Sequence, residues 1–160
     1  MVNFKNVSPN SRVWIYQSNK EFTPIQLKTF EQLKNVFLRQ WESHGSPVKG
    51  EIQVLHNRFI VILIDEADER SCGRSVDASI RFMKELEEEF NITLLDRMLI
   101  AYKKEEQIFS CTIPEFESLA KKGEINKDTV VFNNTVHTVA EFEKGWEVPV
   151  EKSWQKQYLT

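Results

Sequence analysis

Residues 51–64 read EIQVLHNRFIVILI, two apolar segments separated by the polar residues 56–58. The first segment, 51–55, alternates apolar and polar residues, which is typical of a strand with one exposed face. The second, 59–64, is apolar at every position and rich in β-branched residues, which indicates a strand covered on both faces. Because a short polar turn joins them, we predict a β-hairpin whose second strand lies centrally in a sheet.

A strand and a helix are predicted before this hairpin. Residues 13–16 form a short apolar run that favours a strand. Thr23 can cap a helix, Pro24 suits its first position, and Gln26 can complete a capping box. The apolar residues that recur at helical spacing are Leu27, Phe30, Leu33, Phe37 and Trp41. The helix is expected to end by Gly45 and Pro47, which are helix-terminating residues.

The second half of the chain contains further helix and strand signals of the same kinds. We predict a helix opened by Ser75 and Asp77 and ended near Asn91, because its apolar residues share one face. Segments 98–102 and 108–111 flank a charged turn and indicate a second hairpin. The remaining predicted elements are a helix from Pro114 to Gly123, a strand at 130–132, a helix from Thr138 to about Gly145, and an apolar tail lying across the domain.

The first six elements run strand, helix, strand, strand, helix, strand, which is the ferredoxin-like βαββαβ order with the first and third strands in the centre. We therefore predict an α+β fold with a mixed, mainly antiparallel sheet of five or six strands and a C-terminal βαβα-type extension. The length of 160 residues suits a single globular domain, 1–160.

Composition narrows the function classes. The formal net charge is −3 and the pI about 5.7, so nucleic acid is not expected as a partner. No stretch has the roughly 18 apolar residues needed to span a bilayer, and residues 1–12 do not resemble a signal peptide, so we expect a cytoplasmic protein without membrane partners. Cys72, Cys111 and the three histidines lack metal-ligand spacing. No metal or other cofactor is predicted.

The main candidate site follows the apolar strand 59–64. Asp65 and Glu66 come at its end, where either could serve as a general base or metal ligand. Gly73, Arg74 and Ser75 then lead into the predicted helix. Helix N-termini present unpaired N–H groups, and a guanidinium pairs well with carboxylate or phosphate. With Asp77, these residues are candidate ligand-binding residues for a small anion.

The same residues also have a purely structural interpretation. Ser75 can cap the helix while Asp77 complements its dipole, and Gly73 can make a tight turn. Arg74 can pair with a nearby carboxylate such as Asp65. The amides of residues 133–134 have the same two readings, a ligand contact or a turn, and we favour the turn.

Four apolar residues followed by Asp65-Glu66 are similar to the Walker B element of nucleotide hydrolases. Such enzymes also need a phosphate-binding loop of the form G-x-x-x-x-G-K-[ST], and none of the five glycines begins one. P-loop ATPase activity is therefore predicted to be absent. No G-x-S-x-G nucleophile elbow is present either.

Several segments together resemble an uncharacterised bacterial family whose members are often labelled "ABC transporter ATPase". The resemblance covers nearly the whole chain and rests on residues 13–18, Trp41 with His44-Gly45, 64–66, 75–77, 131–134, 146–149 and 153–154. The resemblance implies that the chain has relatives in this family, but it does not indicate a reaction. The ATPase label conflicts with the absence of a P-loop.

Two functional hypotheses follow. The leading one is a non-enzymatic binding or regulatory domain, because no complete catalytic constellation can be assembled from the sequence. Such a domain could also form a homodimer. The alternative is an enzyme or ligand-binding protein acting on a small anionic, perhaps phosphorylated, molecule at the segment Asp65–Asp77.

Overall fold

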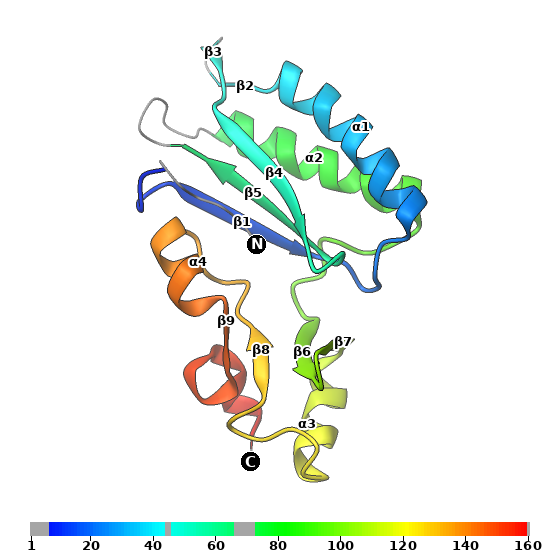
Figure 1. The fold of residues 1–160 in the computed structure, drawn as a ribbon, viewed down its shortest axis with the longest axis vertical. Coiled ribbons are helices and arrows are strands. Elements are labelled where there is room, and N and C mark those ends of the chain that lie inside the picture. Colours follow the sequence, from blue (N-terminus) through cyan, green and yellow to red (C-terminus); the bar gives the residue numbers. More distant parts are fainter. Residues whose placement is uncertain (1–6, 44–45, 66–72, 160) are drawn as a thin grey trace. The chain divides into compact units, whose positions relative to one another are not determined.

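The structure is a computed structural model that describes residues 7–43, 46–65 and 73–159, with residues 43, 46 and 73–75 described by their backbone only (Figure 1). Contacts divide the chain into two compact units. The first comprises Met1–Leu95 with His137–Ala140, and the second comprises Asp96–Val136 with Glu141–Thr160.

The first unit contains a three-stranded antiparallel sheet in the order β1-β5-β4. Its strands are β1 (Arg12–Gln17), β4 (Gly50–Leu55) and β5 (Phe59–Ile64). All six residues of β5 are buried, whereas β4 lies at the edge of the sheet and is partly exposed. The turn between them has positive φ at residues 56 and 57, as tight hairpin turns require. The predicted hairpin and its buried central strand are confirmed.

The first helix, α1 (Pro24–Gln40), begins at the predicted capping box. Thr23 Oγ1 accepts a hydrogen bond from the Gln26 backbone at 3.1 Å, and Gln26 Oε1 accepts one from the Thr23 backbone at 3.0 Å. The helix ends at residue 40, earlier than expected, because Trp41 takes an extended conformation and is buried. Gly50 makes room for this ring, since a Cβ there would overlap Trp41 Cζ3. The two-residue strands β2 (Glu42–Ser43) and β3 (Ser46–Pro47) follow.

The second helix, α2 (Gly73–Phe90), ends at Asn91, whose φ of 52° stops the helix as predicted. Figure 1 shows α1 and α2 on the same side of the sheet. The largest buried side chains of the core that they share with the sheet are Tyr16, Phe30, Ile60, Ile62, Ile64, Met83, Leu86 and Leu94.

The second unit contains a four-stranded antiparallel sheet in the order β7-β6-β8-β9. Its strands are β6 (Ile100–Lys104), β7 (Gln107–Cys111), β8 (Val130–Phe132) and β9 (Glu147–Pro149). The other elements are α3 (Ile113–Lys121), most of α4 (Val139–Gly145), whose first two residues belong to the first unit, and the 3-10 helices η1 (Val150–Lys152) and η2 (Trp154–Tyr158). Val150 is fully buried in the core of this unit, and the two η helices place Trp154 and Tyr158 against it. The apolar tail therefore packs on the fold.

The α+β class is confirmed, but the strands form separate sheets of three and four strands in place of one mixed sheet of five or six. The fourth predicted strand became β6, which pairs with β7 and β8. In the ferredoxin-like order this strand would lie beside β1. That edge of β1 is instead bonded by residues 137–139, since Val13 N donates to His137 O and Val139 N donates to Ser11 O, both at 3.0 Å.

Within the described residues, no helix is both long and apolar enough to cross a membrane.

Candidate functional site

The predicted site at the end of β5 is only partly described. Glu66 lies outside the described residues, as do the side chains of Arg74 and Ser75, although α2 begins at Gly73. Asp77 is in the first turns of α2 and is exposed. The anion site and its structural alternative both stay predictions.

Among the described residues of the predicted site, Asp65 makes hydrogen bonds to other parts of the fold. It is half-buried directly after β5, and its backbone N–H donates to Lys49 O at 2.9 Å. Its Oδ1 accepts a hydrogen bond from the fully buried Ser11 hydroxyl at 3.4 Å. The two contacts attach the end of the central strand to the segments that precede β4 and β1, respectively.

The two asparagines after β8 form a turn, as predicted. Asn133 Oδ1 accepts from the backbone N–H of Thr135 at 3.1 Å and also from its hydroxyl. Asn134 Oδ1 accepts from Trp146 Nε1 at 2.9 Å. Both amide oxygens thus have partners inside the second unit.

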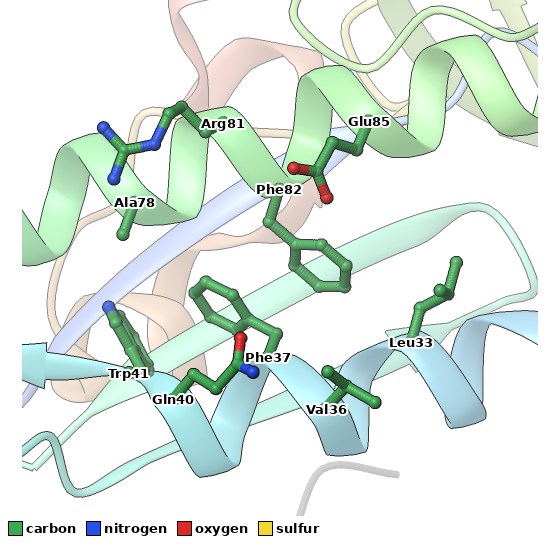
Figure 2. A pocket seen from close by; sticks show the side chains of 9 residues that line it. All are labelled: Leu33, Val36, Phe37, Gln40, Trp41, Ala78, Arg81, Phe82 and Glu85. Atoms are coloured by element: carbon green, nitrogen blue, oxygen red, sulfur yellow. The ribbon is translucent and has the colours of Figure 1, made fainter.

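A groove that the sequence did not predict lies between α1 and α2 (Figure 2). Its volume is about 310 Å³, at the lower end of the range for small-molecule sites. We call it the α1–α2 groove. The described residues that line it are Leu33, Val36, Phe37, Gln40, Trp41, Ala78, Arg81, Phe82 and Glu85.

Aromatic rings form the inner wall of the α1–α2 groove. Phe37 and Phe82 stack at 4.6 Å between ring centroids with an interplanar angle of 9°, and Figure 2 shows these two rings side by side. Trp41 adds a tilted ring 5.1 Å from Phe37. Behind them, Phe30 stacks on Phe82 at 6.3 Å. Phe82 and Trp41 are buried and Phe37 is half-buried, and their mutual packing gives this wall a fixed shape.

The outer part of the groove is apolar on α1 and charged on α2. Leu33 and Val36 on α1 are 37% and 44% exposed, which is high for large aliphatic side chains. Across from them, α2 contributes the exposed side chains of Arg81 and Glu85, one helical turn apart (Figure 2). The groove therefore offers an apolar surface with a cation and an anion at its rim.

The lining residues are suited to binding more than to catalysis. The described lining includes no serine, cysteine or histidine, and a single carboxylate. Acid–base catalysis usually needs a second titratable group within hydrogen-bond reach. Across the described parts of the chain, no three histidine, cysteine or acidic side chains are grouped so that they could hold a metal ion.

No family model, curated protein or solved structure matches this chain.

The sequence of α1 does carry a signal of the groove, which lies in the distribution of its charges and not in its apolar residues alone. Leu33 and Phe37 both belong to the apolar series at helical spacing, yet Leu33 is 37% exposed. The uncharged residues Ile25, Thr29, Gln32, Leu33, Val36 and Gln40 recur along one side of α1 at helical spacing. The charged residues of α1 are Lys28, Glu31, Lys34 and Arg39, and they fall outside this side. An exposed helix side without charge is the signal of an interaction surface.

The described thiol, Cys111, is poorly placed to act as a nucleophile. It is buried in the core of the second unit, and burial together with the nearby Glu115 carboxylate raises the pKa of the Cys111 thiol to about 12. A neutral, covered thiol reacts slowly, because the thiolate is the reactive form.

We expect this pKa to be visible in reactivity and in stability. In a Cys72→Ser background, a thiol reagent should label Cys111 far more slowly in buffer than in denaturant at pH 8. Between about pH 9 and 12 the unfolded thiol loses its proton while the folded one keeps it, so the free energy of unfolding should fall as pH rises. Urea unfolding should show a shallower fall for Cys111→Ala. Equal labelling rates in buffer and denaturant would contradict the burial.

Proposed function

We propose that this chain is a non-enzymatic binding domain and that the α1–α2 groove is its binding surface. The observation that carries the proposal is the pair of exposed aliphatic side chains, Leu33 and Val36, beside a rigid aromatic wall. Exposed apolar surface next to a shaped concavity, with few polar groups, is the usual composition of a binding site.

The polar groups of the groove would orient what binds there. Arg81 can pair with a carboxylate or sulfonate, and Gln40 can donate and accept hydrogen bonds. The aromatic wall of Phe37 and Phe82 would contact apolar atoms. A ligand or peptide segment with an apolar body and an anionic end matches this arrangement.

Binding of an aromatic sulfonate fluorescent probe tests the proposal at the lowest protein concentration that fluorescence allows. We expect saturable binding with one probe per chain. The substitution Val36→Glu should weaken it at least about tenfold, since a charge would enter the apolar part of the groove. The matched control is Met98→Glu, which adds the same charge at an exposed apolar side chain outside the groove and should leave binding unchanged.

Two results would contradict the proposal. One is an absence of saturable binding, and the other is equal binding by the wild type and Val36→Glu. The alternative function, a small anionic molecule held near Asp65–Asp77, makes a different prediction. Inorganic phosphate should then raise the melting temperature of the wild type and of Val36→Glu but not that of Arg74→Ala.

A further inference from the structure

The occupant of the α1–α2 groove can be inferred from the distribution of its apolar and charged groups. The large hydrophobic side chains that are exposed among the described residues are Ile25, Leu33, Val36, Met98 and Phe109. Three of them lie on α1, and Ile25, at 79% exposure, is the most exposed. Together with residues 29, 32 and 40 they form the uncharged side of α1 that borders the groove.

This uncharged side runs along nearly the whole helix. From residue 25 to residue 40 it covers fifteen steps, about 22 Å at 1.5 Å per residue. That length suits an elongated partner such as another helix more than a compact small molecule. Charged residues would be expected on this side if α1 faced only water, and it has none.

The charges on α2 indicate which helix would lie there. Arg81 and Glu85 are one turn apart and of opposite sign. When an identical α2 approaches in the antiparallel direction about a twofold axis level with residue 83, Arg81 of each copy faces Glu85 of the other. An isologous interface needs this kind of self-complementarity, because each patch must match itself after rotation.

We propose that the partner at the α1–α2 groove is a second copy of this chain, so that α1 packs on α1 and α2 on α2 in antiparallel pairs. The inference rests on the proposed function and names the partner of the same surface. Leu33 and Val36 would be covered near its centre and Ile25 at its edge, and two Arg81–Glu85 pairs would flank it. Outside these pairs, Asp77 of each copy would be level with Glu89 of the other, and a crossing angle between the helices would keep these like charges apart.

The test is the molar mass measured by sedimentation equilibrium over a range of protein concentrations. We expect a reversible monomer–dimer equilibrium for the wild type. Either Arg81→Glu or Glu85→Arg alone should weaken dimerisation by about tenfold or more, because like charges would then face each other across the interface. The double variant carrying both substitutions exchanges the two signs and should return the dissociation constant to within about threefold of the wild type.

Controls separate folding from association. Both charges are on exposed side chains, so far-UV circular dichroism and the unfolding midpoint of the dilute protein should change little. Met98→Glu should dimerise like the wild type. Probe binding should decrease as protein concentration rises, because the second copy and the probe compete for the groove.

The outcomes also separate this inference from the proposed function. A monomer at every concentration that still binds the probe would overturn the dimer and leave the binding function standing. The inference would be overturned if neither single charge reversal weakened the dimer. It would also be overturned if the double variant did not restore dimerisation, because self-association would then involve another surface. A monomer without probe binding would overturn both.

Discussion

The Phe82→Ala variant is expected to lose about 3–5 kcal/mol of unfolding free energy, the usual cost of removing a buried phenylalanine ring. Phe82 is 4% exposed and stacks on both Phe37 and Phe30. Its removal takes away apolar burial and leaves a cavity between the two helices. Urea denaturation followed by circular dichroism measures the loss.

Val36→Ala is the matched control for Phe82→Ala, because it removes apolar atoms from the same groove at a side chain that is 44% exposed. It should cost well under about 1 kcal/mol, as substitutions at the surface usually do. If Phe82→Ala cost no more than Val36→Ala, the aromatic wall of the groove could not be packed as described.

The Glu87→Ala variant is expected to cost about 2 kcal/mol. Glu87 Oε2 accepts hydrogen bonds from the backbone N–H groups of Leu94 and Leu95, at 2.7 and 3.0 Å. Leu94 is 1% exposed, so its N–H would lose a charged acceptor in a place with little access to water. Glu87→Gln keeps an acceptor oxygen and should lose about half as much.

Glu88→Ala is the control for Glu87→Ala. Glu88 is the next residue of α2 and is exposed, so it shares the helix and the charge but not the two backbone contacts. The free energies of unfolding from urea titration should place Glu88→Ala within about 0.5 kcal/mol of the wild type. An equal loss in the two variants would mean that the helix charge, and not the hydrogen bonds, determines the effect.

Local elements were predictable because their causes are local. The capping box that starts α1 needs only Thr23, Gln26 and the intervening backbone, and the hairpin at 51–64 needs only alternation and a polar turn. The structure has a capping box of the same kind at the start of α3, between Thr112 and Glu115, which we did not predict. These contacts form within a few residues of chain.

The assignment of strands to sheets was predicted less well, because segments far apart in the chain compete to pair with the same strand edge. The strand predicted at 98–102, which is β6 (Ile100–Lys104) in the structure, would lie beside β1 in the ferredoxin-like order of elements. Residues 137–139 bond that edge instead, more than 120 positions along the chain from Ser11 and Val13. The apolar pattern of a strand specifies which face is buried but not which strand edge it joins.

The candidate site shows the same division. The sequence by itself determined that β5 is buried on both faces, where α1 starts and where α2 stops, since composition and capping act over short distances. Only the tertiary structure decided that Leu33 and Val36 lie across the groove from the charged residues of α2. That juxtaposition requires α1 and α2, some forty residues apart, to pack on one side of the sheet, and no local pattern specifies where two helices meet.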